Sequence, residues 1–416
     1  ARGLETMALL LESFDDREEA EKIRKLMRVV RYGSEDGSVA ARSAEAADAH
    51  LTKKQRILAE TLPAEALPSW RDVVSPQADV TRGVYRKAEF AADLAQVAAS
   101  EAQSEYQDPV EFFGRTYVTA GMQGLLSQAL SRVAGGSGEP VIQLKTAFGG
   151  GKTHSMLALY HLMKSGTVLG DTPRTREQLE PVFEAAGVFR VPKVHVACVV
   201  GTALNPARST RPENMPGITV NTLWGEIVYQ LALSAGKPEL YDLVKEADKK
   251  HVSPGSDVLR HVMDECGSCL VLLDELVAYA KKLYGVDGLK AGSFDNFITF
   301  VQELTEAARA SRSSLVVASI PESEREIGGE AGQLALEAIE HTFGRMESIW
   351  KPVTKDEGFE IVSRRLFLPV EDTAARDRVC EAFGALYRDN AGEFPVEAKE
   401  ADYERRLAAC YPVHPE

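Results

Sequence analysis

Four nearly continuous apolar runs constrain the fold of this chain more than any other feature of its sequence. They are VIQLKTA, KVHVACVVG, CLVLLDE and SLVVASI. Runs of this kind are typical of strands buried on both faces of a parallel sheet. Amphipathic segments such as TVNTLWGEIVYQLAL and FDNFITFVQELTEAARAS lie between them, so strand and helix alternate along the chain. We therefore predict an α/β fold with three layers, in which helices cover both faces of a parallel sheet.

Helical patterns flank this region on both sides. The predicted parts are a helical N-terminal module at 1–60, a linker and helices at 61–139, the α/β core with insertions at 140–353, and a truncated helical region at 354–416. Prolines and Trp70 interrupt the helical period in the linker. Further on, Asp108 and Pro109 are predicted to be the N-cap and the first helical residue of a second helical block, which the loop AGGSGEP ends.

Composition excludes several classes of protein. The chain is 44% hydrophobic and 26% charged, which is ordinary for a globular protein, and no run approaches the length of a membrane helix. A net charge of −14 repels polyanions, so any DNA contact requires a local basic patch. Five cysteines, an odd number, fit a reducing compartment, and no signal peptide is visible. We expect a cytoplasmic protein without membrane contact and, from its abrupt ends, a piece of a longer chain.

The segment VIQLKTAFGGGKTHSMLALYHLM has the form of a phosphate-binding loop. A strand leads into three glycines, whose backbone N–H groups converge on an anion, and a helix follows whose N-terminus adds its dipole. Lys152 is predicted to reach the β and γ phosphates and the Thr153 hydroxyl to ligate Mg²⁺. Thr146 stands where the standard pattern has glycine, which affects the geometry of the loop rather than its phosphate chemistry. The predicted nucleotide-binding residues are Phe148, Gly149, Gly150, Gly151, Lys152, Thr153 and His154.

Two carboxylates follow the buried run CLVLL. Asp274 and Glu275 at the end of a buried strand are costly unless a cation meets them. We predict that Asp274 holds Mg²⁺ through water and that Glu275 polarises the attacking water. The alternative is an exposed acidic pair at a helix start, where the helix dipole favours acids.

A third strand supplies Ser319. The run SLVVASI is predicted to lie between the other two motif strands, which brings the Ser319 hydroxyl near the γ-phosphate or the attacking water. The alternative is a hydroxyl that is hydrogen-bonded within a turn. Thr202 and Asn205, after the run KVHVACVVG, form a weaker case of the same kind.

We expect an arginine to supply a further positive charge at the predicted nucleotide site. Arg345 precedes the short β-like run IWKPV, and Arg364 and Arg365 follow on the next helix. An arginine there neutralises transition-state charge, in its own subunit or in a neighbour's; the alternative for each is a surface salt bridge. Cys266 and Cys269 lack a second pair at metal-ligand spacing and are interpreted as core thiols.

With Lys152, Asp274–Glu275, Ser319, Arg345 and the segment IWKPVTKDEGFEIV in this order, the chain resembles the AAA+ ATPases. The resemblance implies a 5-1-4-3-2 sheet, ATP bound between the core and a helical lid, and frequent self-association into rings or other oligomers. The stretch between Lys152 and Asp274 is longer than in compact members, and the excess is where we expect partner-specific surface.

A narrower resemblance covers about residues 69–416. PSWRDVVSPQADVTRGVYRKAEFAADL, YQDPVEFFGRTYVTAGMQGLL, QLKTAFGGGKTHSMLALYHL and YPVHPE are similar to a bacterial family of large ATPases known as domain of unknown function 499. Its FGGGKTHS form has the same non-glycine start. The resemblance implies a role in operons for defence against phage, with a DNA methyltransferase and a helicase as partners. It also relates residues 1–60 to the tail of an HEPN-like domain, although no R-x4-H ribonuclease motif is present.

Three functions are therefore carried forward. The first is an ATPase, with ATP and Mg²⁺ as cofactors, that drives or licenses such an assembly. The second is a scaffold that binds nucleotide without hydrolysing it. The third, direct translocation of DNA, requires basic or aromatic pore loops, which the sequence does not reveal.

Overall fold

The computed structural model divides into two compact units. One runs from Ala88 to Thr354, and the other joins the chain up to Lys87 with the chain from Lys355 onwards. Each unit is described below by itself. The structure describes residues 67–82, 93–102, 104–146, 151–322, 328–343, 355–390, 392, 394–400 and 402–415.

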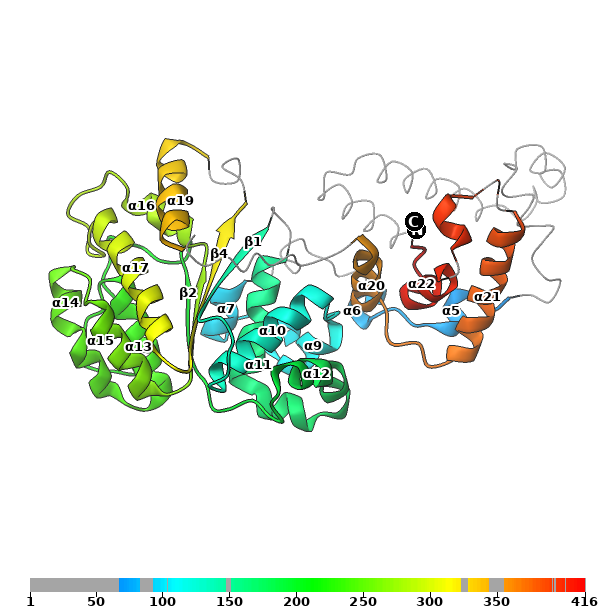
Figure 1. Cartoon of the computed structure of the whole chain (residues 1–416), viewed down its shortest axis with the longest axis horizontal. Coiled ribbons are helices and arrows are strands. Elements are labelled where there is room, and N and C mark those ends of the chain that lie inside the picture. The colour runs from blue at the N-terminus through cyan, green and yellow to red at the C-terminus, as the bar shows by residue number, and fades with distance from the viewer. Residues whose placement is uncertain are drawn as a thin grey trace. The chain divides into compact units, whose positions relative to one another are not determined.

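A parallel sheet forms the centre of the first unit (Figure 1). Its described strands are β1 (Val141–Thr146), β2 (His195–Val200), β3 (Cys269–Asp274) and β4 (Ser314–Pro321). The order is β1-β4-β3-β2 and every pairing is parallel. The four apolar runs are thus the four strands, and the prediction that the Ser319 strand lies between the other two motif strands is confirmed. The expected fifth strand, IWKPV, lies outside the described residues.

Side chains alternate between two hydrophobic clusters, one on each face of the sheet. On β3, Cys269, Val271 and Leu273 belong to one cluster, and Leu270 and Leu272 belong to the other. Because successive strand residues point to opposite faces, a run without polar residues is buried on both sides. The predicted α/β fold with helices on both faces is therefore what the structure shows.

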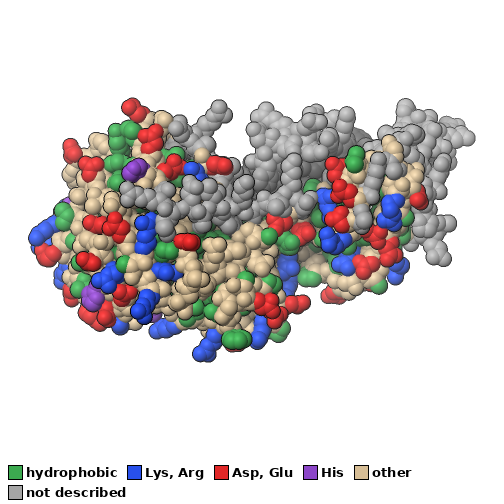
Figure 2. Space-filling view, in the orientation of Figure 1, with side chains coloured by type: hydrophobic (Ala, Val, Ile, Leu, Met, Phe, Trp, Pro, Cys, Tyr) green, Lys and Arg blue, Asp and Glu red, His purple; other side chains and the backbone are tan. Residues whose placement is uncertain are grey.

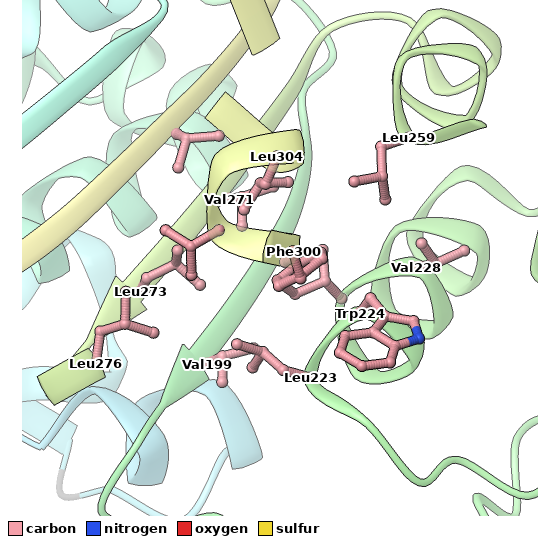
Figure 3. Packing of buried hydrophobic residues seen from close by; sticks show 14 of the residues in the cluster. Val199, Leu223, Trp224, Val228, Leu259, Val271, Leu273, Leu276, Phe300 and Leu304 are labelled. Atoms are coloured by element: carbon pink, nitrogen blue, oxygen red, sulfur yellow. The ribbon is translucent and has the colours of Figure 1, made fainter. Parts of the chain in front are cut away.

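Helices with long apolar stripes cover the first face. Figure 3 shows Trp224 and Phe300 among the buried side chains of this cluster. Their ring centroids lie 5.5 Å apart. Each fully buried side chain of this size contributes about 1.5–3 kcal/mol. The helices on this face of the sheet are α13 (Leu223–Ala235), η2 (Pro238–Leu243), α14 (Lys245–Lys250), α15 (Ser256–Cys266), α16 (Leu276–Leu283), α17 (Phe294–Ala310) and α19 (Glu330–Phe343).

The second face is covered by helices that come earlier in the chain. They are α7 (Leu94–Ala99), α8 (Ser104–Gln107), α9 (Pro109–Arg115), α10 (Ala120–Val133), α11 (Lys152–Asp171) and α12 (Pro173–Ala186). Asp108 is the N-cap of α9, its carboxylate accepting from Glu111 N at 2.8 Å, and Pro109 is the first helical residue, as predicted. The predicted second helical block consists of two helices, because the chain leaves α9 at Thr116. A second N-cap, Thr119, then starts α10 by accepting from Met122 N at 3.0 Å.

The second unit combines two distant stretches of the chain. From the first stretch come α5 (Trp70–Val73) and α6 (Ala78–Arg82), and from the second come α20 (Lys355–Leu366), α21 (Thr373–Asp389), η3 (Val396–Lys399) and α22 (Tyr403–Cys410). Gln77 N donates to Leu366 O at 2.9 Å, Leu368 N donates to Ser75 O at 2.8 Å, and Trp70 meets Phe367 edge to face. The segment around Trp70, predicted as linker, therefore pairs with the region that follows the core. The helical module predicted at 1–60 lies outside the described residues.

Candidate nucleotide site

The strand ends that carry the predicted motifs meet at one edge of the sheet. Because β1, β3 and β4 are parallel neighbours, their carboxyl ends lie together, which is where open α/β sheets bind ligands. β3 ends at Asp274, and Ser319 lies one residue beyond the paired positions Leu273 and Ala318. The helix α11, which starts directly after the glycine loop, directs its N-terminus to the same edge, where Thr153 meets Asp274.

Asp274 is the centre of the site. Its side chain is 3% exposed, and within the described residues it accepts hydrogen bonds from three neutral donors. Thr153 Oγ1 donates to Oδ2 at 3.1 Å, while Ser319 Oγ and Glu275 N donate to Oδ1, the latter at 3.0 Å. The structure thus brings Thr153 and Ser319, which are far apart in the sequence, onto one buried carboxylate.

The donor set around Asp274 fits Mg²⁺. A hydroxyl that donates its proton to a carboxylate keeps its oxygen lone pairs, so Thr153 Oγ1 is able to ligate a cation while it is hydrogen-bonded to Asp274. Mg²⁺ takes oxygen ligands, keeps several waters and is held by one or two protein groups together with phosphates. Within the described part of the chain, no group of three or more His, Cys, Asp or Glu residues is placed to hold a metal.

The structure describes the start of α11 from Gly151 onwards. Gly151 is the N-cap with φ 81°, a left-handed conformation that favours glycine, and its carbonyl accepts from Ser155 N at 2.9 Å and from Ser155 Oγ at 2.8 Å. Lys152 is the first helical residue. Phe148, Gly149 and Gly150 lie outside the described residues, as does Arg345.

Glu275 holds an unusual backbone conformation for its residue type. Its φ of 53° and ψ of 36° are left-handed, where a non-glycine residue is uncommon. Its N–H donates to Ser319 Oγ at 3.0 Å as well as to Asp274, and its side chain is exposed. Such conformations cost about 1–3 kcal/mol and cluster at functional sites. The hydrogen bonds of its N–H fix the backbone position from which the exposed side chain of Glu275 extends.

Ser319 links the two acidic residues. Its hydroxyl donates to Asp274 Oδ1 and accepts from Glu275 N, and its side chain is 3% exposed. Within the described residues the hydroxyl therefore orders the end of β3. Direct contact of Ser319 with a phosphate or with the attacking water stays a prediction.

His154 is anchored to α9. Its Nε2 lies 3.0 Å from Thr116 Oγ1, and its ring lies 4.8 Å from that of Phe112. Thr116 Oγ1 already donates its proton to Phe112 O at 2.8 Å, so His154 Nε2 is the donor in this pair. Gln178 Nε2 of α12 donates to Thr116 O at 2.6 Å. Thr116 thus joins α9, α11 and α12 directly behind the predicted phosphate site.

The remaining candidates are the arginines of α20, two polar residues after β2 and the cysteines. Arg364 and Arg365 belong to α20 in the other compact unit. Asn205 Oδ1 accepts from Ala207 N at 3.0 Å within a turn, and Thr202 is exposed. All five cysteines are free and buried, and burial raises the pKa of Cys266 to about 11 and that of Cys269 to about 12. The interpretation of Cys266 and Cys269 as core thiols is confirmed.

Two residues near the acidic strand end gave no signal in the sequence. Gly201 follows β2, and a Cβ built there would lie 2.2 Å from Glu275 O, so only glycine allows this approach of two backbones. Lys282 belongs to a KK pair in the last turn of α16, a common place for cations. Its ammonium nevertheless turns towards backbone carbonyls after β2.

The described surface of the face in Figure 2 carries acidic and basic side chains interspersed over both units. This distribution gives no extended basic surface on that face. Among the described helices, none combines the length and the apolarity that a bilayer crossing requires.

Comparison with family models of known proteins identifies a match. A model of the family described as the DUF499 N-terminal domain matches residues 73–361. No curated protein and no solved structure matches the chain. The matched range contains β1 to β4, α11 and the residues around Asp274, and it covers more than half of the sequence. The chain therefore belongs to the DUF499 family.

Proposed function

We propose that this chain binds ATP with Mg²⁺ at the carboxyl edge of its sheet and hydrolyses it, as an ATPase of the AAA+ type. The observation that carries the proposal is the contact between Thr153 Oγ1 and Asp274 Oδ2 at 3.1 Å. Two motifs read independently from distant parts of the sequence meet there, in the arrangement that Mg²⁺–phosphate chemistry requires. The strand order β1-β4-β3-β2 agrees with the described part of the 5-1-4-3-2 order expected for that superfamily.

Each residue then has a distinct role. Gly151 and the N-terminus of α11 present backbone N–H groups to the phosphates, and Lys152 adds a point charge. Thr153 ligates Mg²⁺ directly, and Asp274 holds it through water. Glu275, whose side chain is exposed at the site, orients and polarises the water that attacks the γ-phosphate. Arg345 is the proposed source of the cation that neutralises transition-state charge.

The biological role we propose follows from family membership and from the resemblance described above. The ATPase drives or licenses a bacterial anti-phage assembly with a DNA methyltransferase and a helicase, and it associates with itself. The interspersed charges of Figure 2 and the net charge of −14 favour protein partners over extensive direct contact with DNA.

Steady-state ATP turnover tests the site. We expect Lys152→Ala to lose nucleotide binding, because the phosphates lose their cation. Glu275→Gln is expected to keep binding and to reduce turnover by roughly 100-fold or more, since the amide does not accept a proton. Glu239→Gln, an exposed glutamate at the start of η2, is the matched control and should turn over as the wild type does.

The outcomes separate the two main functions. Equal turnover of the wild type and Glu275→Gln would contradict the catalytic assignment. Tight ATP binding that depends on Lys152, without turnover in the wild type and with nucleotide-dependent assembly, would instead support the non-hydrolysing scaffold.

A further inference from the structure

A single lysine ties the end of β2 to the helix that follows the acidic pair. Lys282 Nζ donates to three backbone carbonyls, those of Gly201 at 2.9 Å, Thr202 at 2.9 Å and Leu204 at 2.7 Å. An ammonium group has three donors, so these three acceptors satisfy it completely. The side chain of Lys282 is partly buried, and this burial lowers its pKa.

The same few residues of the chain also touch the other end of α16. Gly201 N donates to Asp274 O at 2.8 Å, and its Cα lies so close to Glu275 O that a Cβ would be 2.2 Å from it. Glu275 is the N-cap of α16, and Lys282 lies in its last turn. The chain after β2 is therefore held at both ends of α16: Gly201 packs beside the N-cap Glu275, and the ammonium of Lys282 binds the carbonyls near the other end.

The loop that begins at Gly201 is fixed at its far end as well. We call residues 201–222 the β2–α13 loop. Asp248, 1% exposed, accepts from Thr222 N at 2.8 Å and from Asn221 Nδ2 at 3.0 Å. Between its two ends the loop exposes Arg208 to solvent. One buried acid and one partly buried lysine thus hold the two ends of the loop, and only the lysine end reaches Glu275.

From this geometry we propose that Lys282 is a positioning residue for hydrolysis: it holds the β2–α13 loop against α16 and so keeps Glu275 in its left-handed conformation beside Asp274 and Ser319. The inference rests on the proposed ATPase function and deepens it. Without the ammonium, the carbonyls of Gly201, Thr202 and Leu204 lose their donor, and the backbone that restrains Glu275 O is free to move.

Two measurements on Lys282→Met test the proposal, since methionine keeps the length and removes the donors. We expect kcat to fall about tenfold or more with KM for ATP within about twofold, because three charge-assisted hydrogen bonds hold the loop and 1.4 kcal/mol corresponds to a factor of ten. In the absence of nucleotide, trypsin should cleave after Arg208 several-fold faster, with the new end identified by mass spectrometry. Lys282→Arg, which retains donors, should recover most of both properties.

Lys193→Met is the matched control, because Lys193 is an exposed lysine that precedes β2, at the opposite end of that strand from Gly201. It should leave kcat and cleavage unchanged. A wild-type kcat in Lys282→Met would overturn the positioning role. Unchanged cleavage after Arg208 would show that Lys282 does not hold the β2–α13 loop against α16. If Lys282→Met does not fold, Lys282→Gln provides the same two readouts with one side-chain amide in place of the ammonium. If the wild type binds ATP without turnover, the proposed ATPase function is wrong. The cleavage experiment then still tests whether Lys282 holds the β2–α13 loop against α16.

Discussion

At the scale of single residues, the candidate site depends on hydroxyl groups as much as on charges. Thr153 and Ser319 each donate to a different oxygen of Asp274, and the N–H of Glu275 closes the set. A buried carboxylate without such donors would cost several kcal/mol. The motif residues were predictable because glycine, lysine and acidic residues at fixed spacing have a known chemistry. The hydrogen bond that Glu275 N donates to Ser319 Oγ was not, since it depends on which strands are neighbours.

Thr116 gives a prediction at this scale. Its hydroxyl accepts from His154 Nε2 and donates to Phe112 O in a buried site, so Thr116→Val removes both of these hydrogen bonds. We expect the free energy of unfolding to fall by about 1–3 kcal/mol. Because His154 directly follows Thr153 in α11, KM for ATP should rise as well.

Urea unfolding and ATP titration measure both effects. Thr116→Ser is the matched control, since it keeps the hydroxyl. Equal stability of Thr116→Val and the wild type would show that the bond to His154 contributes nothing.

At the scale of elements, buried polar side chains decide where helices begin. The α13 helix starts at a Thr222 N-cap whose own N–H and hydroxyl are both held by Asp248. Gly225 lies so close that a Cβ would be 2.2 Å from Asp248 Oδ1. The sequence predicted the helix from its apolar stripe, because that pattern is local. It gave no sign of Asp248, because the carboxylate comes from a helix that follows α13 in the chain.

Asp248→Asn is the prediction for this element. Both carboxylate oxygens accept hydrogen bonds, including one from Tyr241 OH at 2.9 Å, so an amide NH₂ would face donors. We expect a loss of about 2–4 kcal/mol in the free energy of unfolding, measured by urea titration. Asp242→Asn, an exposed neighbour in a surface ion pair with Lys245, should change it by less than about 1 kcal/mol. Equal small losses in both variants would argue against the anchoring role of Asp248.

At the scale of the whole molecule, burial of the thiols makes the free energy of unfolding depend on pH in the alkaline range. Burial raises the pKa of Cys198 and Cys269 to about 12 and that of Cys266 and Cys380 to about 11. An unfolded thiol ionises at about 8.5. The stability that these groups contribute is therefore complete below that pH and is lost as the pH rises towards 11–12, because the unfolded chain releases protons that the folded chain retains.

The urea midpoint should accordingly fall between pH 8 and pH 10. Lys282, whose pKa is lowered, acts in the opposite direction but is a single group. Cys198→Ala should reduce the slope of midpoint against pH, since one buried thiol is removed. A midpoint that is constant or rises over this range would contradict the prediction.

The sequence by itself determined the strands, their parallel arrangement, the helices on both faces and the identity of the acidic strand end. Each of these follows from local chemistry: the apolar period, the capping residues and the spacing of glycine, lysine and acidic residues. Only the tertiary structure decided that Ser319 bonds Asp274, that Gly201 and Lys282 hold the helix after Glu275, and that residues near Trp70 pair with Leu366 and Phe367. These contacts join segments far apart in the chain, and a local pattern carries no information about which distant backbone will supply the partner.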